Sequence, residues 1–258
     1  MLRVQSALLV ICVWAQPIAA ETPQEKGVRI ATEVDVFNNG FQGESSDMTM
    51  VLINAHGDQT KRTMKSETME VSGDGDKSLI TFTSPADVDG TKMLTWTYKT
   101  KNDDQWIYLP AFKRVRRISS RNKSGAFMGS EFAYEDLGSQ EVEKYSYTWL
   151  RDERVDGREC WVMERVPKDS RSGYSKQVVW TDKAYHQAVK IDFYDRKGEL
   201  LKTFTLSAFE AFGKYWRPGL IAAKNHQTKK QSTLAWTQRS FGIAPDAARF
   251  TKDKLEDW

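Results

Sequence analysis

Aromatic side chains interleaved with cations form an unusual run near the middle of the chain, at residues 105–137. A protein core has little use for so many charges beside aromatic rings, whereas an apolar cavity with a charged mouth needs both. The arginine fork is well shaped to hydrogen-bond carbonyl or phosphate groups there. The residues predicted to contact a bound lipid are Trp96, Trp106, Tyr108, Leu109, Phe112, Arg114, Arg116, Arg117, Phe127, Met128, Phe132 and Tyr134.

The basic run at 113–118 has a second interpretation. As a strand it places Arg114 and Arg116 on one face, with Val115 and Arg117 on the other. Exposed cations on an edge strand also prevent that edge from pairing with another chain. The sequence leaves both interpretations open.

Residues that could perform catalysis are scattered. The three histidines, His56, His186 and His226, occupy separate turn-like or strand-edge positions, without the spacing of a metal-ligand pair. The acid pairs at 103–104 and 135–136 are typical of turns and caps, and the sequence contains no nucleophile elbow and no phosphate-binding glycine loop. We therefore expect a binding protein that is not an enzyme, with no catalytic residues, metal or cofactor.

The first twenty residues have the pattern of a secretory signal. Arg3 precedes an apolar run at 7–14, and small residues at 17–20 end the segment before Glu21. The apolar run is shorter than the ~20 residues that span a bilayer. We expect cleavage after residue 20, export across the inner membrane and a periplasmic protein of residues 21–258.

The net charge of the chain argues against nucleic acid as a partner. The net charge of +3 falls to +2 when Arg3 is removed, so the chain lacks the basic surface that nucleic acid requires. Cys160 then remains as the only cysteine, and its position in a predicted strand favours a small buried side chain. Stability must come from a hydrophobic core, which a chain of this length can build.

Periodicity predicts one helix followed mostly by strands. Ile30, Val34 and Phe37 share one helical face within 23–38, and Asn39 and Gly40 end that helix. Turn signals at Asp156-Gly157 and at 196–198 separate alternating runs. The predicted strands are 48–53, 61–71, 79–83, 93–98, 144–154, 159–166, 176–181, 187–194, 200–212, 216–224 and 231–240. Pro245 opens a short closing helix with Phe250 and Leu255 facing inward.

These elements predict a mainly β fold with a few helices. About eleven antiparallel strands exceed what an open sheet carries without curling, so we expect a large curved antiparallel sheet that forms an incomplete β-barrel. A barrel wider than about eight strands leaves a cavity. Helical segments at 23–38, near 125–137 and at the C-terminus can serve as lid or plug, within a single domain at 21–258. Gly125 and Gly129 flank Phe127 and Met128 and could hinge the lid.

Four motifs carry a family resemblance through nearly the whole mature chain. They are W-I-Y-L-P at 106–110, R-V-R-R-I at 114–118, F-M-G-S-E-F at 127–132 and Y-E-D-L at 134–137, with D-M-T-M at 47–50 and D-R-K-G at 195–198 in support. With these motifs the chain resembles the bacterial outer-membrane lipoprotein-sorting proteins. The resemblance implies the LolA/LolB-like fold, an incomplete barrel closed by helices over a cavity for acyl chains.

The resemblance also implies the function and the partners. We expect a periplasmic, monomeric carrier that binds a lipid or the acyl chain of a lipoprotein, for transfer toward the outer membrane, with transient membrane contact. One alternative is an accessory lipid-binding subunit of an inner-membrane transporter of the resistance-nodulation-division type. The other is an enzyme that modifies lipid or glycan of the cell envelope.

Overall fold

The computed structural model describes residues 20–256, so the predicted signal segment, except for residue 20, lies outside the described residues. Helix α1 (Pro23–Asn38) opens the described chain and confirms the predicted helix. Thr22 begins it with a capping box: Thr22 Oγ1 accepts from the Glu25 amide at 3.2 Å, and the Glu25 carboxylate accepts from the Thr22 amide at 2.8 Å. The helix ends at Asn38, and the positive φ of Gly40, 89°, is incompatible with a continued right-handed helix.

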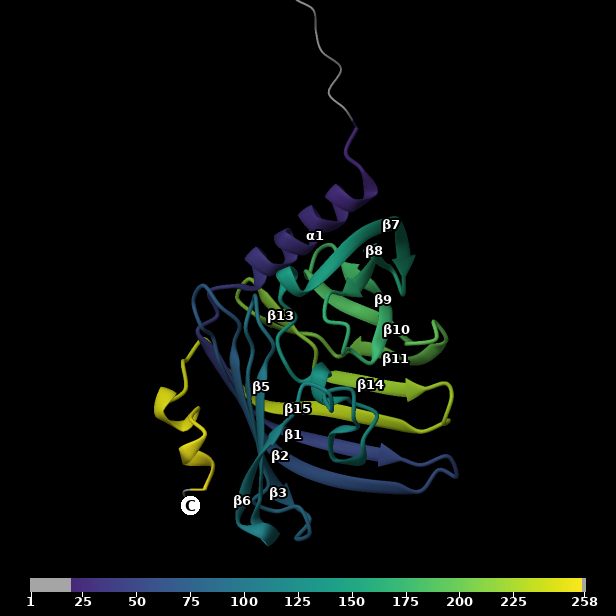
Figure 1. The fold of residues 1–258 in the computed structure, drawn as a ribbon. Helices are drawn as coiled ribbons and strands as arrows, with labels where there is room; N and C mark the ends of the chain where they lie inside the picture. The colour runs from purple at the N-terminus through teal and green to yellow at the C-terminus, as the bar shows by residue number, and fades with distance from the viewer. Residues whose placement is uncertain (1–19, 257–258) are drawn as a thin grey trace, which may run out of the picture.

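One antiparallel sheet of thirteen strands forms most of the molecule (Figure 1). Its strand order is β6-β5-β4-β3-β2-β1-β15-β14-β11-β10-β9-β8-β7. A small hairpin of β12 and β13 is separate from this sheet. The bounds are β1 (Gly43–Ile53), β2 (Gln59–Met69), β3 (Lys77–Ser84), β4 (Lys92–Trp96), β5 (Asp104–Leu109), β6 (Arg114–Ile118), β7 (Tyr145–Val155), β8 (Arg158–Pro167), β9 (Tyr174–Asp182), β10 (Gln187–Asp195), β11 (Leu200–Ser207), β12 (Glu210–Phe212), β13 (Tyr215–Arg217), β14 (Leu220–Asn225) and β15 (Gln231–Phe241).

The structure confirms the predicted fold class and refines the strand boundaries. The central motif itself supplies β5 and β6, which were not among the predicted strands. The runs 200–212 and 216–224 each break into two strands. Ala208 has a φ of 51°, which interrupts the ladder of β11, and the Gly219 backbone passes so close that a Cβ there would lie 2.6 Å from the Ala208 carbonyl oxygen. Periodicity alone does not reveal such a break.

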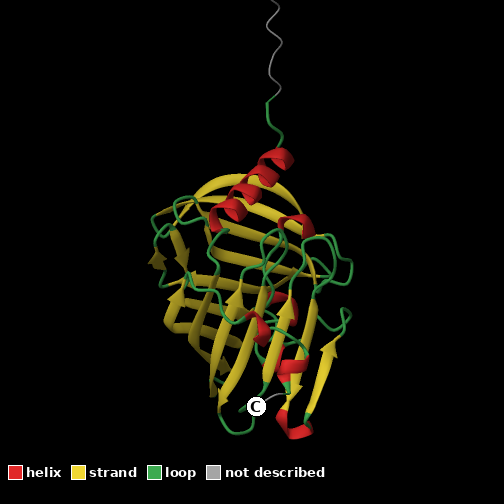
Figure 2. Cartoon of the chain, turned by 90° about the vertical axis from the view of Figure 1, so that its left-hand side faces the viewer, coloured by secondary structure: helices red, strands yellow, loops and turns green. Residues whose placement is uncertain are grey.

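The sheet curls without closing, so β6 and β7 remain as its two edges (Figure 2). Within residues 20–256 no backbone ladder joins them. Side chains cross this seam instead. Lys123 Nζ lies 2.9 Å from Asp169, Lys144 pairs with Asp103, and Arg171 donates to Ser120 Oγ at 2.9 Å. The barrel is therefore held shut at its seam by ion pairs rather than by strand pairing.

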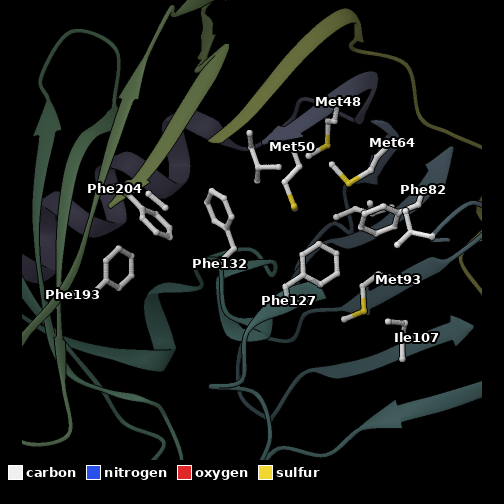
Figure 3. Close-up of a cluster of buried hydrophobic side chains, with 14 of the residues drawn as sticks. Met48, Met50, Met64, Phe82, Met93, Ile107, Phe127, Phe132, Phe193 and Phe204 are labelled. Atoms are coloured by element: carbon white, nitrogen blue, oxygen red, sulfur yellow. The ribbon is translucent and has the colours of Figure 1, made fainter. Parts of the chain in front are cut away.

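The segment 119–137, here called the plug, fills the middle of the concave face. It contains the short 3-10 turns η2 (Phe127–Gly129) and η3 (Tyr134–Asp136). Figure 3 shows Phe127 and Phe132 between Phe193 and Phe204 on one side and methionines of β1, β2 and β4 on the other. This cluster buries Met48, Met50, Met64, Phe82, Met93, Ile107, Phe127, Phe132, Phe193 and Phe204, among others.

The C-terminal segment lies on the opposite, outer face of the sheet (Figure 1). Two 3-10 turns, η5 (Ala247–Arg249) and η6 (Asp253–Leu255), replace the predicted closing helix. Phe250 and Leu255 are buried as expected, but they pack on Leu79 and Leu94 outside the barrel. The prediction that this segment plugs the cavity is therefore wrong, because alternate residues of β3 and β4 leave a second apolar surface for it to cover.

Cys160 is fully buried on the outer face of β8, packed with Val162, Val178, Trp180 and Val189. Burial raises the pKa of the Cys160 thiol to about 11, which keeps it protonated. Among the described residues, none of the helices combines the length and apolar character that spanning a bilayer requires.

Candidate functional site

The predicted site residues divide between the two faces of the sheet. Trp96, Trp106 and Tyr108 belong to the outer cluster beneath the C-terminal segment. Trp96 donates from Nε1 to the Phe250 carbonyl at 2.9 Å, and its ring meets Trp106 edge to face at 5.1 Å. The structure thus corrects the expectation that these three aromatics share a cavity with Phe127, because strand alternation sends them outward.

The remaining apolar residues of the prediction do come together in the concave core. Phe127 and Phe132 are almost fully buried, and Leu109, Met128 and Tyr134 pack partly buried against the same cluster. The Phe127 ring lies 5.8 Å from Phe82 and 5.7 Å from Tyr134, measured between centroids. The plug side chains themselves therefore occupy the space that the sequence assigned to a ligand.

The cationic residues of the prediction lie along the edge strand β6. Arg114, Arg116 and Arg117 are exposed, and Phe112 is 62% exposed at the tip of the β5–β6 hairpin. Arg117 pairs with Asp104, while the Arg116 guanidinium lies 5.5 Å from the Phe112 ring. These positions agree with a protected sheet edge and place the arginines away from the concave core.

Two polar anchors, one half-buried and one buried, hold the plug in place. Arg62 of β2 donates from Nη1 to the Met128 carbonyl. Lys202 of β11 pairs with Asp136 at 2.6 Å, and both side chains are nearly excluded from water. Tyr174 also donates to Asp136, at 2.8 Å. Since breaking a buried ion pair is costly, the plug is a fixed part of the core rather than its most mobile element.

A cavity of about 720 Å³ lies beside this core, under α1. Its size falls within the ~300–1,000 Å³ typical of small-molecule sites. Apolar side chains from α1 and from the concave face line it: Ala31, Val34, Phe41, Tyr147, Met163, Val179, Ala188, Ile191 and Leu206. The sequence analysis missed these residues, although the alternation of 187–194 and the helical face with Val34 were visible. What it lacked was the position of α1 over β7.

Carboxylates line another wall of the same cavity. Glu70, Asp74 and Asp76 come from the β2–β3 turn, and Glu141 comes from the connection before β7. Burial, more than any other influence, raises the pKa of Asp76 to about 7, and the charges of Glu141 and Glu70 act in the same direction. Burial likewise raises the pKa of Glu141, although a hydrogen bond from Ser139 opposes the shift.

The side chains of the lining cations Lys99, Arg165 and Arg217 make no hydrogen bond or ion pair with these carboxylates among the described residues, although Arg217 acts through space on Asp76 and Lys99 on Glu141. Arg217 lies 3.6 Å from Glu44 and donates to Asn38 at 3.0 Å. Burial lowers the pKa of Arg217, and Glu44 opposes that shift. Arg165 donates to Gln177 at 2.6 Å. The carboxylate wall is therefore left without a directly bonded cation among the described lining residues.

Helix α1 is attached to the sheet by close packing at two points. At Gly27 the helix approaches β7 so closely that a Cβ would lie 2.9 Å from the Trp149 amide nitrogen. At the other end the Phe37 ring stacks on His186 with centroids 4.0 Å apart. The helix thus forms one side of the cavity, where Ala31, Val34 and Asn38 line it.

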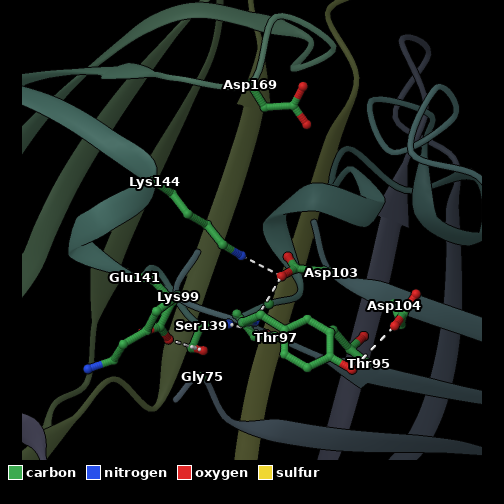
Figure 4. A network of polar contacts seen from close by, with 12 residues as sticks. Gly75, Thr95, Thr97, Lys99, Asp103, Asp104, Ser139, Glu141, Lys144 and Asp169 are labelled. Atoms are coloured by element: carbon green, nitrogen blue, oxygen red, sulfur yellow. Dashed lines mark hydrogen bonds and ion pairs between the residues drawn. The ribbon is translucent and has the colours of Figure 1, made fainter. Parts of the chain in front are cut away.

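A short strap, residues 138–142, contributes Ser139 and Gln140 to the lining of both this cavity and a second pocket at the seam. Figure 4 shows Ser139 and Glu141 of the strap within a network of polar contacts. Ser139 donates its amide to Thr97 at 3.2 Å and its hydroxyl to Glu141 at 2.6 Å. The seam pocket has a volume of about 500 Å³. Its cations are Lys99, Lys101, Lys123, Lys144, Lys168 and Arg171. The two sides of the strap therefore differ in charge.

Among residues 20–256, no three histidine, cysteine, aspartate or glutamate side chains lie close enough together to hold a metal ion. The geometry offers a partly open cavity with apolar and polar walls, which is suited to holding an amphipathic molecule.

Comparison with known proteins identifies the family. A family model described as "Uncharacterized protein" matches residues 74–257. Proteins of curated function offer no match. A crystal structure of a domain from Vibrio parahaemolyticus, described as an outer membrane lipoprotein-sorting protein, is 47% identical, with a TM-score of 0.88 over 90% of this chain and 99% of that one.

Two further structures agree in fold. A DUF1329 family protein from Desulfovibrio piger is 31% identical, with a TM-score of 0.86 over 91% of this chain and 99% of that one. A LolA superfamily protein from Nitrosomonas europaea is 21% identical, with a TM-score of 0.69 over 87% of this chain and 97% of that one. The chain therefore belongs to the family of outer membrane lipoprotein-sorting proteins and has a LolA-like fold.

Proposed function

We propose that this protein is a periplasmic carrier that holds the hydrocarbon chain of a lipid or lipoprotein in the cavity under α1, for transfer toward the outer membrane. The observation that carries the proposal is the cavity of about 720 Å³ with apolar walls on the concave face of a lipoprotein-sorting fold. The signal-like first twenty residues support the periplasmic location.

Burial of the chain supplies the binding energy. Each methylene removed from water contributes about 0.8 kcal/mol, so a chain of ~16 carbons could gain on the order of 12 kcal/mol. Release then requires a cover whose movement offsets part of that gain. We assign this role to α1, because the plug is fixed by the buried pair of Lys202 and Asp136, whereas among the described residues α1 is held by packing and by hydrogen bonds of Asn38, without a buried ion pair.

Filling the cavity tests the proposal. Ala188 lines the cavity, so Ala188→Trp places an indole where the ligand chain would lie. We expect the affinity for a fluorescent fatty-acid probe to fall more than tenfold. The matched control is Ala184→Trp, at an exposed position in the β9–β10 turn that precedes the strand of Ala188, and it should leave binding unchanged. Equal binding by the parent protein and Ala188→Trp would remove this cavity as the site.

A second candidate is a subunit that docks on an inner-membrane transporter. The exposed side chains of Arg114, Arg116 and Phe112 on the edge strand β6 favour it, since unpaired edges and exposed aromatics are typical of contact surfaces. A photocrosslinker at position 116 tests it: a crosslink to a membrane protein in cells supports docking, and crosslinks to lipid alone contradict it.

We also propose that the protein acts without enzymatic activity. The named relatives are described as sorting or carrier-fold proteins, and the cavity walls bring together carboxylates without a nucleophile beside them. Incubation of the purified protein with ester substrates should release no product above the uncatalysed rate. Turnover that is lost in Asp76→Asn would instead assign catalysis to this cavity.

A further inference from the structure

The polar walls of the cavity distinguish between ligands that share the same hydrocarbon chain. Apolar side chains come from α1 and strands β7–β11, while carboxylates come from the β2–β3 turn and the strap. A bound amphiphile would lay its chain along the first surface and its head against the second. This inference rests on the proposed function, because it concerns the ligand of the same cavity.

The carboxylates of that wall are bonded to neutral donors. Asp76 Oδ1 accepts from the Val71 amide at 3.2 Å, and Glu141 Oε1 accepts from Ser139 at 2.6 Å. The Glu70 oxygens accept from the amides of Gly40 and Gln42. None of these bonds neutralises the charge, so the wall remains electronegative when the acids are ionised.

The nearest cations offset this charge only in part and through space: Lys99 and Lys144 lower the pKa of Glu141, and Arg217 lowers that of Asp76, but burial has the larger effect and raises both. Lys99 influences Glu141 through space without a hydrogen bond to it, and Arg217 is turned to Glu44 and Asn38. The residue Glu141 is only 6% exposed, so water screens its charge weakly. The carboxylates would repel an anionic head group, whereas a cationic head group would form ion pairs with them.

We propose that the ligand is an amphiphile whose head carries a positive charge, such as a primary ammonium group, held by Asp76 and Glu141 beside the strap. The head forms charge-assisted hydrogen bonds with the two carboxylates, while the chain lies under α1 against Val34, Ile191 and Leu206. Burial raises the pKa of Asp76 to about 7, so a cation placed beside this carboxyl group would stabilise its ionised form.

Three amphiphiles of equal chain length test the inference: dodecylammonium, dodecanoate and dodecanol. Each is titrated against the full mature protein at pH 8, above the pKa of Asp76, in competition with a fluorescent probe. We expect dodecylammonium to bind at least tenfold more tightly than dodecanoate, with dodecanol between them. Equal or tighter binding of dodecanoate overturns the inference.

The variants separate charge from structure. In the double variant Asp76→Asn and Glu141→Gln, the ratio of the two affinities should fall to within threefold while dodecanol affinity is unchanged. If the double variant does not fold, Glu141→Gln alone should reduce the ratio by at least threefold. The control Glu143→Gln lies on the seam side of the strap and should leave the ratio unchanged. A ratio that survives in the folded Glu141→Gln variant contradicts the assignment.

Failure of the two proposals can be distinguished. If none of the three amphiphiles binds, dodecanol included, the carrier function itself is contradicted and the inference falls with it. If all three bind with equal affinity, the cavity is a lipid site, and only the preference for a cationic head is wrong.

Discussion

Lys202 and Asp136 form an ion pair of 2.6 Å whose side chains are only 4% and 6% exposed. Lys202 also donates to the Glu131 carbonyl at 2.8 Å, so one ammonium group fixes two points of the plug. Its nitrogen lies between 4.8 and 5.3 Å from the ring centroids of Tyr174, Phe193 and Phe204. A charge surrounded in this way ties the plug to β11 in the centre of the barrel.

Removal of this charge should destabilise the fold. Lys202→Met leaves the Asp136 carboxylate buried without its cation, and we expect a loss of about 3–5 kcal/mol in the free energy of unfolding. Urea denaturation measures it. The control is Lys176→Met, which breaks a partly exposed pair with Glu164 at 2.8 Å and should cost less than about 1 kcal/mol. Equal losses in both variants would contradict the anchoring role of Lys202.

Truncation of the plug aromatic should have a similar effect through packing. Phe127→Ala leaves a void among Phe82, Tyr134 and their neighbours, and we expect a loss of about 3–5 kcal/mol. Phe112→Ala, at a side chain that is 62% exposed, should change stability by less than about 0.5 kcal/mol. Thermal unfolding of both variants checks the contrast, and an unaffected Phe127→Ala would show that the plug adds little to the core.

Gly27→Ala should weaken the packing of α1 over the cavity, although alanine normally stabilises a helix relative to glycine. In an exposed helix this change gains up to about 1 kcal/mol. Here the new methyl group would lie 2.9 Å from the Trp149 amide nitrogen and 3.0 Å from that of Thr148, so α1 must move away from β7. We expect lower stability and faster release of a bound fatty-acid probe in stopped-flow measurements. Val28→Ala, at a neighbouring side chain that is nearly half exposed, serves as the control. A Gly27→Ala variant that is more stable than the parent protein would contradict the prediction.

Asp76 should make stability fall as pH rises. Its folded-state pKa of about 7 lies above the ordinary value of 3.8, so the folded protein keeps a proton that the unfolded chain loses between pH 4 and pH 7. The free energy of unfolding is not reduced below pH 4 and is reduced by the full amount above pH 7, by at most about 4 kcal/mol. Burial is the main cause of the raised pKa; the charges of Glu141 and Glu70 raise it further, and the charge of Arg217 opposes the shift.

The Asp76→Asn variant removes that reduction in the free energy of unfolding. It should be more stable than the parent protein at pH 8, and the difference should shrink toward pH 4 in urea titrations across this range. Asp74→Asn is the matched control, because hydrogen bonds from the Lys99 and Gly75 amides lower the pKa of Asp74. That variant should gain no stability at pH 8. A pH-independent difference for Asp76→Asn would contradict the assigned shift.

The fold was largely predictable from the sequence, because alternation, turn residues and capping act locally. Helix 23–38 and the hairpin at Asp156 and Gly157 follow from such signals, and both central hairpin residues adopt the expected positive φ. The incomplete barrel followed from the number of strands. The strand β5 was overlooked because its aromatic residues, Trp106 and Tyr108, were interpreted as a binding surface.

The site was harder to predict, since it depends on which face each strand turns inward. Trp106 and Ile107 are adjacent in the chain but lie on opposite faces, and the sequence does not say which face is concave. The cavity combines α1, the β2–β3 turn and the strap, three segments far apart in sequence. Their approach is set by tertiary packing at Gly27 and His186, which no local pattern records.

At the open seam between β6 and β7, the circumference of this barrel is not fixed by backbone hydrogen bonds of the described residues. A cylinder whose strands all pair has its circumference fixed by backbone hydrogen bonds, but here the last link consists of charged side chains such as Lys123 and Asp169. Salt weakens attraction between partly exposed charges. Higher ionic strength should therefore weaken the side-chain link between the two edges while the backbone hydrogen bonds of the sheet stay intact.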